Sequence, residues 1–463
     1  MRKFSLFLLI LLALTALVAC GGGGTETTPN PTAETATEPT AETAVEPTAE
    51  TAVEPTAEAA AEPVDISFMV FGDAAELAAY ESLVAAFTAS QSDVTVTLTH
   101  IPSQGDYRAR LATDFAAGTP PDVSLLNFRR IGAFVAAGQL EPLGPYLDAS
   151  DAMSPEEFYP VTLEAFTWND QVMCIPQNIS SLVVYYNRDL FTAAGVAEPA
   201  DDWTWDDFLA AAQALTLDSD GDGQIDQYGA GIEASLFRLA PFIWQNGGEL
   251  VDDAAFPQQL ALTRVPAQAA LTWFTELQTV HHVVPDRIAE ESLDSESRFI
   301  EGTTAMYFNS RRGTPTYREI TAFDWDIAPL PRGTETAGVL HSDGYCLSAV
   351  AADKDAAWRF IEFANSVEGQ TIIAGSGRTV PSIISVAESE AFLDPNVRPA
   401  RARVFLDTIP ELRLVPLLST WDEIESTGSK EVERAFYGDI TPEEAALQAR
   451  LRTEEYFQLA VRP

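Results

Sequence analysis

The sequence has 463 residues and a formal net charge of -42, from 69 acidic and 27 basic side chains. Only nine of the acids lie between Cys20 and Pro63, so the acidity belongs to the rest of the chain. An acidic body repels polyanions, which excludes nucleic acid and anionic lipid headgroups as partners. The only lysines, Lys3, Lys354 and Lys430, leave almost no position for a Schiff-base or phosphate-loop lysine.

The N-terminus has the pattern of a secretory signal. Arg2 and Lys3 precede an apolar run over residues 4–18, and Cys20 follows a small residue. Residues 17–20 (LVAC) resemble the bacterial lipobox, so we expect cleavage before Cys20 and acylation of its sulfur; an ordinary signal peptide with a chance cysteine is the alternative. Since no later stretch reaches the roughly 18 apolar residues of a membrane span, the lipid is the only expected anchor. The predicted location is extracytoplasmic, on the outer face of the cell membrane, at the cell surface or in a periplasm.

A low-complexity segment follows the signal peptide of residues 1–20. Residues 21–63 contain Gly, Thr, Ala, Glu and Pro, and residues 31–62 repeat an eight-residue unit four times, each unit beginning Pro-Thr-Ala-Glu. Because this composition offers no large apolar side chains to bury, the segment is predicted to be a disordered, proline-stiffened tether.

The remaining residues, 64–463, exceed the roughly 250 to 300 residues at which one core stops growing, so two lobes are expected. Alternating apolar residues predict strands, and apolar residues every three or four positions predict helices. In chain order these patterns give strand 65–70, helix 77–87, strand 94–98, helix 107–115 and strand 122–126. A capping box at residues 441–444 opens a last helix to about residue 460. The order β-α-β-α-β indicates an α/β fold.

Several motifs, taken in order, resemble one family. They are residues 121–127 (PDVSLLN) with 134–143 (FVAAGQLEPL), 174–178 (CIPQN) with 184–191 (VYYNRDLF), 203–208 (WTWDDF), 302–308, 344–349, 356–363 and 368–370. The chain resembles extracellular solute-binding protein family 1, the group that contains the maltose-binding protein. It departs from the family pattern at Arg188, where lysine is usual, and at Asp201 and Asp202, where proline is usual.

This resemblance implies a two-lobed, type II periplasmic-binding-protein-like fold with hinge crossovers between discontinuous lobes. We expect lobe one at 64–177 and 326–370, and lobe two at 178–325 and 371–463. Ligand is then held at the carboxyl ends of the strands, as in open α/β sheets generally, and binding is hinge closure. The implied function is delivery of a solute, most often a sugar, to the transmembrane subunits of an ABC importer by a monomeric, non-enzymatic protein.

A sugar site needs polar side chains for hydroxyls and accessible aromatic rings for C–H faces. The positions carried over from the family are Asn127, Arg129, Arg130, Gln177, Asn178, Ser180, Phe237, Arg238, Asn246, Asn309, Ser310, Arg311, His341, Ser342, Asp343 and Trp421. Trp421 stands in a polar segment at the family's stacking position, so we expect it to stack on the sugar. Arg129 with Arg130, and Arg311 with Arg312, either fork onto hydroxyls or a carboxylated sugar or pair with neighbouring acids.

One loop resembles a calcium-binding EF-hand loop. Acids occupy its positions 1, 3, 5 and 9, and Gly occupies position 6, as that motif requires. The candidate ligands are Asp218, Asp220, Asp222, Gln224 and Asp226. Position 12 is Gly229 rather than Glu, so a metal-free Asp-Gly turn stays open as the alternative. A bound calcium would be structural, and no other cofactor is expected.

Cys174 and Cys346 remain after Cys20 is lipidated. Outside the cell they could form one disulfide, but their separation does not indicate proximity, and two isolated buried thiols are the favoured expectation. Neither a G-x-S-x-G nucleophile motif nor a phosphate-binding loop occurs, and the four histidines lack metal-ligand spacing.

Two alternative functions stay open at this point. A secreted, lipid-anchored glycoside hydrolase could hide two catalytic carboxylates among the 69 acids. The same binding fold could also serve a peptide, a polyamine or another non-sugar solute, and the acidic field would favour cations.

Overall fold

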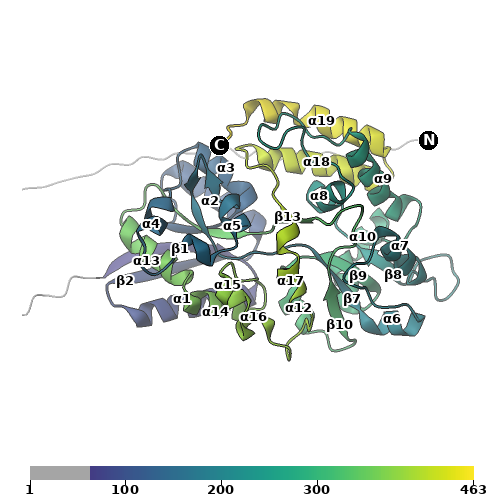
Figure 1. Ribbon diagram of the computed structural model, residues 1–463, viewed down its shortest axis with the longest axis horizontal. Helices are drawn as coiled ribbons and strands as arrows, with labels where there is room; N and C mark the ends of the chain where they lie inside the picture. Colours follow the sequence, from purple (N-terminus) through teal and green to yellow (C-terminus); the bar gives the residue numbers. More distant parts are fainter. Residues whose placement is uncertain (1–62) are drawn as a thin grey trace, which may run out of the picture. The chain divides into compact units, whose positions relative to one another are not determined.

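A computed structural model describes residues 63–463, all of which belong to one compact unit. The signal peptide, the lipidation site at Cys20 and the tether up to residue 62 lie outside the described residues. The unit contains two larger sheets, each with its own helices, and these form two lobes (Figure 1).

The first sheet has five strands in the order β2-β1-β3-β12-β6. They are β2 (Val94–Ile101), β1 (Val64–Phe71), β3 (Val123–Asn127), β12 (Asp343–Leu347) and β6 (Cys174–Pro176). The first three strands are parallel, and β12 runs antiparallel to both β3 and β6. The sheet of the first lobe therefore includes β12, a strand from late in the sequence, between β3 and β6.

The second sheet has four strands in the order β10-β7-β9-β8. They are β10 (Trp325–Ala328), β7 (Val183–Asn187), β9 (Thr304–Asn309) and β8 (Tyr228–Gly231). Strand β8 is parallel to β9, whereas β7 and β10 are antiparallel to their neighbours. Two further ladders pair β11 (Gly338–Val339) with β13 (Leu412–Arg413), and β4 (Thr167–Trp168) with β5 (Gln171–Val172).

Helices surround both sheets. With the first sheet lie α1 (Ala74–Ser90), α2 (Gln104–Ala117), α3 (Phe128–Ala136), α4 (Gly144–Ala149), η1 (Pro155–Glu157), α5 (Pro160–Ala165), α13 (Lys354–Ala364), α14 (Val367–Gly375), α15 (Ile384–Ala387) and α16 (Glu390–Leu393). With the second lie α6 (Arg188–Ala194), α7 (Trp205–Ala214), α8 (Leu236–Gln245), α9 (Val265–Thr279), α10 (Arg287–Ser292), α11 (Ser295–Glu301), η2 (Arg311–Gly313) and α12 (Thr314–Arg318). Beyond α17 (Val404–Asp407) and η3 (Ile409–Glu411), the helices α18 (Trp421–Phe436) and α19 (Pro442–Leu459) pack on each other and on α9.

The elements predicted from the sequence are confirmed. The three expected strands are β1, β2 and β3, the two helices between them are α1 and α2, and the capped C-terminal helix is α19. Thr441 caps α19 by accepting from the Glu444 amide at 3.2 Å. The α/β, two-lobed fold is as expected, and none of the described helices combines the length and apolar character of a membrane span.

Two of the expected lobe boundaries are displaced. Residue 326 falls inside β10, which pairs with β7 in the second sheet. Residue 370 falls inside α14, which packs on α1 of the first lobe and carries α15 and α16 with it. The chain therefore re-enters the first lobe at β12 and leaves it after α16, because strand pairing and helix packing, rather than motif position, decide the boundary.

The expectation of two isolated thiols was wrong. Cys174 and Cys346 stand directly opposite each other in the antiparallel pair β6 and β12 and form a disulfide. Both are fully buried. The sequence separation of 172 residues hid this contact, because it arises only when β12 returns to the first sheet.

Candidate functional site

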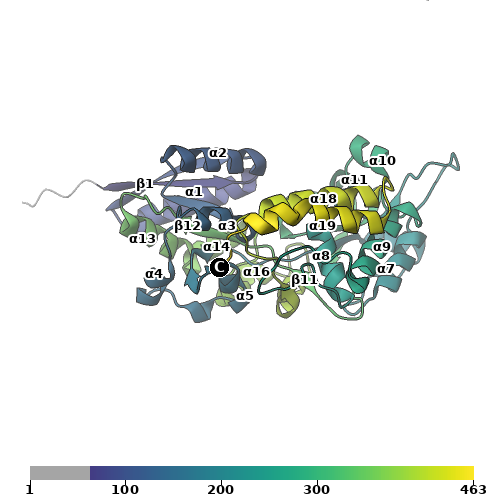
Figure 2. The same ribbon diagram turned by 90° about the horizontal axis from the view of Figure 1, so that it is seen from above.

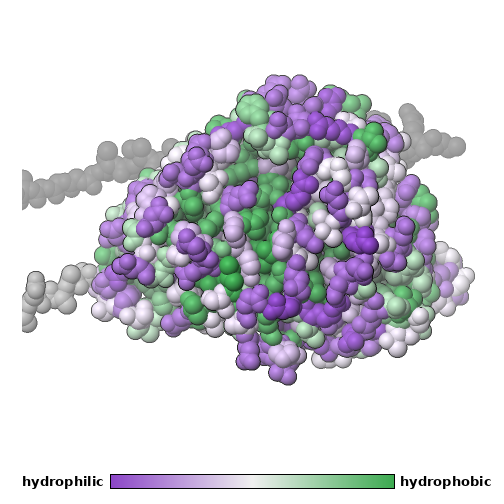
Figure 3. Space-filling view, viewed as in Figure 1, coloured by the Kyte–Doolittle hydropathy of each residue, from purple (hydrophilic) through white to green (hydrophobic). Residues whose placement is uncertain are grey.

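A cavity of about 1030 Å³ lies between the two lobes. Its walls come from the loop after β1, the start of α3 and residue Asp343 in the first lobe, and from the start of α8, from α10, α11 and α18 in the second. Figure 2 shows α2 and α10, which both contribute to the lining, on the same side of the unit. The opposite side, seen in Figure 3, is hydrophilic over most of its area with apolar side chains nearer its middle.

The first-lobe wall is built at strand ends. Asn127 ends β3 and caps α3, because its side-chain oxygen accepts from the Arg129 amide at 3.3 Å. Its amide nitrogen donates to Asp343 Oδ1 at 3.1 Å, across the β3 and β12 pair. The cap therefore positions both a guanidinium group and a carboxylate at the cavity.

The crossovers form the floor of the cavity. Ser180 and His341 exchange two backbone hydrogen bonds, each of 2.8 Å, so the two crossover segments are joined as a short bridge. Asn178 accepts from the Asp343 amide at 3.0 Å. These contacts fix four polar residues, Asn178, Ser180, His341 and Asp343, where the lobes meet.

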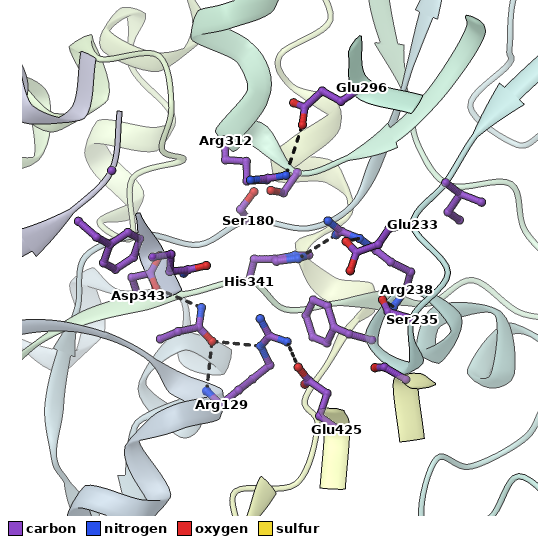
Figure 4. A pocket seen from close by; sticks show the side chains of 18 of the residues that line it. Arg129, Ser180, Glu233, Ser235, Arg238, Glu296, Arg312, His341, Asp343 and Glu425 are labelled. Atoms are coloured by element: carbon purple, nitrogen blue, oxygen red, sulfur yellow. Dashed lines mark hydrogen bonds and ion pairs between the residues drawn. The ribbon is translucent and has the colours of Figure 1, made fainter. Parts of the chain in front are cut away.

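A compact group of side chains occupies the middle of the cavity (Figure 4). The Arg129 guanidinium lies 3.7 Å above the centre of the Phe237 ring, and that ring meets His341 edge-on at 4.7 Å. Arg238 donates to His341 Nε2 at 3.3 Å, so Nδ1 carries the imidazole proton. Burial, with Arg238 and Arg129 nearby, lowers the pKa of His341 well below its ordinary value, so the ring is neutral.

Three groups in the lining are buried without a hydrogen bond to any described residue. They are His341 Nδ1, Ser180 Oγ and Glu76 Oε2. Tyr307 also lines the cavity, and its hydroxyl makes no hydrogen bond within residues 63–463. Buried polar groups normally have a hydrogen-bond partner. A polar ligand in the cavity would supply the partner that these atoms lack.

Most of the arginines in the cavity are paired with acids. Arg129 and Arg130 both bind Glu425, at 2.6 and 3.1 Å, and Arg130 also pairs with Asp422. Burial alone would raise the pKa of Glu425, but the two arginines outweigh it and hold the pKa below its ordinary value. The Arg129 contact joins α3 of the first lobe to α18, so the cavity is bridged on this side.

Further ion pairs line the opposite wall. Arg238 pairs with Glu233 at 3.2 Å, and Arg312 pairs with Glu296 at 3.5 Å. The lining as a whole contains six guanidinium groups and nine carboxylates, an excess of three negative charges when all are ionised. The cavity therefore favours a neutral or cationic ligand over an anion.

Comparison with known proteins decides the family. The family model for bacterial extracellular solute-binding proteins matches residues 72–371. The chain belongs to this family. A putative binding protein of Brucella abortus (strain 2308) is 23% identical to this solute-binding protein over 386 residues, covering 81% of this chain and 89% of the other. The maltotriose-binding protein of Pyrococcus abyssi (strain GE5 / Orsay) is 24% identical over 295 residues, covering 62% of this chain and 59% of the relative.

Solved structures share the two-lobed fold. An ABC substrate-binding protein from Listeria monocytogenes in complex with cycloalternan aligns with a TM-score of 0.77 at 24% identity, over 86% of this chain and 98% of the other. Maltose-bound MalE3 of T. maritima aligns with a TM-score of 0.70 at 22% identity, over 86% and 99%. At these identities the likeness shows the fold.

Most of the predicted site residues of this solute-binding protein meet in the cavity. Those in the lining are Asn127, Arg129, Arg130, Asn178, Ser180, Phe237, Arg238, Ser310, His341 and Asp343. For Arg129 and Arg130 the two interpretations of the arginines coincide, since both residues line the cavity and also pair with acids.

Six predicted residues lie outside the lining. Gln177 is buried and donates to Tyr80 at 2.7 Å, Ser342 donates to the Asn178 carbonyl at 2.6 Å, and Asn246 donates to the Pro266 carbonyl at 2.8 Å. The other three are Asn309, Arg311 and Trp421. These side chains hold loops and helix ends in place rather than reaching the cavity.

Asn309 and Arg311 are predicted site residues that do not line the cavity. Asn309 is the last residue of β9 and Arg311 is the first residue of η2, and both are buried. Ser310 and Arg312, the residues that directly follow them, line the cavity. Asn309 donates to the Tyr317 hydroxyl at 2.7 Å, and Arg311 donates to the Gly377 carbonyl at 3.0 Å. Each of these two predicted residues is therefore a core residue that lies one position before a residue of the cavity lining.

Trp421 is also a core residue. It is the first residue of α18, it is 1% exposed, and its Nε1 donates to Glu425 at 3.2 Å. Because the ring is buried and does not line the cavity, its position does not support the expected stacking on a sugar. The polar neighbours that suggested an accessible ring, Asp422 and Glu423, point outward from the helix instead.

Sequence reasoning missed the acids that pair with the arginines. Glu76, Glu233, Glu296 and Glu425 line the cavity, but each lies in an acid-rich chain with no local motif. Arg378 was missed as well, although it binds both Asp73 and Glu76. No pattern in the sequence distinguishes these residues, because their partners are far away along the chain.

The acidic loop lies outside the cavity lining. Carboxylate oxygens of Asp218, Asp220 and Asp222 approach within 4.8 Å of one another, and all three residues are exposed. Asp218 accepts from the Gly221 and Gly223 amides at 2.8 and 2.9 Å, so the loop has an ordered turn. This donor set fits the oxygen preference of calcium, with Gln224 and Asp226 as the remaining candidate ligands.

Proposed function

We propose that this protein is a lipid-anchored, extracytoplasmic binding subunit of an ABC importer that closes its two lobes around a sugar or oligosaccharide. The observation that carries the proposal is the interlobe cavity, whose lining includes His341 Nδ1 and Ser180 Oγ as buried groups without partners in the described residues. Sugar hydroxyls both donate and accept, so they would satisfy groups of either kind.

The size and lining of the cavity support a ligand larger than one sugar unit. Small-molecule sites occupy about 300 to 1,000 Å³, and this cavity, with about 1030 Å³, is slightly larger than that range. The aromatic side chains in the lining, Phe71, Phe237, Tyr307 and Tyr437, could contact C–H faces. Relatives described as binding maltotriose, maltose and cycloalternan are consistent with an oligosaccharide.

Contacts between the lobes support hinge closure. Arg378, which follows α14, donates to the Arg312 carbonyl of the second lobe at 3.3 Å. Arg129 reaches Glu425 on α18. Such contacts stabilise the closed arrangement, and a solute between the lobes would add to them.

A binding role is favoured over the glycoside hydrolase alternative, because the homologues are solute-binding proteins rather than enzymes. Incubation of the protein with oligosaccharides and analysis of the products tests this point. We expect every oligosaccharide to be recovered intact. Release of shorter sugars would favour the hydrolase.

A thermal-shift screen tests the ligand class. The panel contains mono- and oligosaccharides together with peptides and polyamines, which represent the non-sugar alternatives. A ligand at 100 times its dissociation constant adds about 2.7 kcal/mol to the folded state, so a fitting sugar should raise the melting temperature. Stabilisation by peptides or polyamines alone would contradict the sugar assignment.

The lipid anchor has its own test. Cys20→Ser removes the sulfur that would be acylated, so the variant should appear in the medium or remain uncleaved. The control is Ser92→Ala, at an exposed position, which leaves both the N-terminal signal and the disulfide intact. A normally processed Cys20→Ser protein that stays on the membrane would contradict the anchor.

A further inference from the structure

Three carboxylates and the guanidinium group of Arg378 meet at the corner of the cavity between the start of α1 and the start of β12. Asp73 and Glu76 lie at the start of α1, and Asp343 lies at the start of β12. One guanidinium group, Arg378, pairs with Asp73 at 2.8 Å and with Glu76 at 2.6 Å. Asp343 has no ion pair within the described part of the chain and accepts from the Asn127 amide group instead. These three acids are called the acidic corner below.

Glu76 supplies a buried acceptor that nothing in the described residues uses. The residue is 6% exposed, and its Oε1 takes the contact with Arg378, whereas its Oε2 has no hydrogen-bond partner there. The Glu76 carboxylate packs directly against Gly72, where a Cβ would lie 1.7 Å from Oε2, so only glycine at position 72 admits this placement of the carboxylate. Both residues line the cavity. The unpaired oxygen therefore belongs to a buried side chain of the cavity wall.

We propose that the acidic corner binds a protonated amino group, so that the preferred solute is an amino sugar or an oligosaccharide that contains one. The inference rests on the proposed function, since it concerns the same cavity. An ammonium group brings three donors and a compact positive charge, whereas a hydroxyl brings one donor and no charge. The excess of negative charge in the lining opposes a uronate.

The titration of Glu76 gives the proposal a pH signature. Burial raises the pKa of Glu76 to about 7; Arg378 opposes this rise, while Asp343 and Asp73 add to it. Tyr80, which packs near Glu76, stays protonated because burial raises its pKa well above its ordinary value. A bound ammonium favours the ionised carboxylate, so binding near neutral pH should release a proton from Glu76.

The affinity for an amino sugar should then increase as the pH rises toward neutrality. An amino group with a pKa like that of an α-amino group, about 7.7 to 8, stays mostly protonated up to about pH 7. Between about pH 5.5 and 7 the ionised fraction of Glu76 rises, and the affinity for the amino sugar should rise roughly tenfold with it. The neutral counterpart should show a much smaller change.

The experiment titrates the protein calorimetrically with matched sugars. The pairs are glucosamine with glucose, galactosamine with galactose, and chitosan oligomers with cello-oligomers, and glucuronic acid serves as the anionic probe. Each binding amino sugar should bind about tenfold tighter than its neutral counterpart, as expected for a hydrogen bond to a charged group. At pH 7, buffers with different ionisation heats should reveal the proton release.

Glu76→Gln should abolish both the amino preference and the proton release. Glu81→Gln, an exposed glutamate on the same helix, is the matched control and should keep both. If Glu76→Gln does not fold, the buffer comparison on the unaltered protein decides, and absence of proton release overturns the proposal.

The outcomes separate this inference from the proposed function. A neutral sugar that binds as well as or better than its amino counterpart overturns the inference alone, as does a preference that survives in Glu76→Gln. Failure of every amino and neutral sugar to bind contradicts both.

Discussion

The hydroxyl groups of Tyr307 and Tyr185 differ in whether they make hydrogen bonds with residues that the structure describes. Tyr307 is 7% exposed, and burial raises its pKa, so its hydroxyl stays protonated. That hydroxyl makes no hydrogen bond to the described residues, whereas Tyr185 of the neighbouring strand donates to the Ser310 carbonyl at 3.1 Å. Tyr307 is therefore available to the solute, and Tyr185 belongs to the scaffold.

Tyr307→Phe tests this distinction. Loss of one hydrogen bond to a solute should weaken binding by about 0.5 to 1.5 kcal/mol, with little change in the melting temperature. Titration calorimetry of the variant measures the effect. Tyr146→Phe, outside the cavity lining, is the control and should bind as the unaltered protein does; equal affinity in both variants would remove the Tyr307 hydroxyl from the site.

Trp421→Ala should act on stability rather than on stacking. A buried tryptophan replaced by alanine costs about 3 to 5 kcal/mol of unfolding free energy, and Trp421 is fully buried. Denaturant unfolding measures the loss, and Trp421→Phe should lose less because it keeps part of the packing. If instead stability is unchanged and sugar binding disappears, the ring contacts the solute after all.

At the scale of elements, one covalent bond joins the strands that lead into and out of the crossovers. The disulfide between β6 and β12 closes a loop of 172 residues. Cys174→Ser with Cys346→Ser should lower the unfolding free energy by about 2 to 4 kcal/mol. A reducing agent should bring the unaltered protein to the same stability and leave the variant unaffected. Free thiols in the unreduced, denatured protein would show that the bond does not form.

The acidic loop between α7 and β8 carries a separate prediction. Calcium at about 10⁻⁴ to 10⁻³ M, the range of weak extracellular sites, should raise the melting temperature, and magnesium should do so less. Solute affinity should be the same with and without calcium, because none of Asp218, Asp220 and Asp222 lines the cavity. An absolute calcium requirement for solute binding would contradict the separation of the loop from the solute site. If calcium does not change the melting temperature, the loop is a metal-free turn.

The elements could be predicted from the sequence better than the site could. Apolar periodicity is local, so β1, α1, β2 and α2 were found in order. Positions at strand ends, such as Asn127 and Asp343, were identified through the resemblance to the family. The disulfide and the acid partners of Arg129 and Arg378 depend on contacts between distant segments, and no local pattern encodes those.

At the scale of the whole molecule, the proposed function requires one solute bound between the two lobes. Ala234 lies in the segment between β8 and α8, lines the cavity and is partly exposed. Ala234→Trp should fill part of the cavity without burying a large group in the core. Ala193→Trp, at an exposed position of α6, adds the same bulk elsewhere.

Calorimetric titration of the unaltered protein and these two variants, with the sugar that the thermal-shift screen selects, tests the central claim most directly. We expect one sugar or oligosaccharide to bind per chain, with equal affinity in Ala193→Trp and loss of binding in Ala234→Trp at an unchanged melting temperature. Full affinity in Ala234→Trp, or no heat of binding from any sugar in the panel, would contradict the central claim.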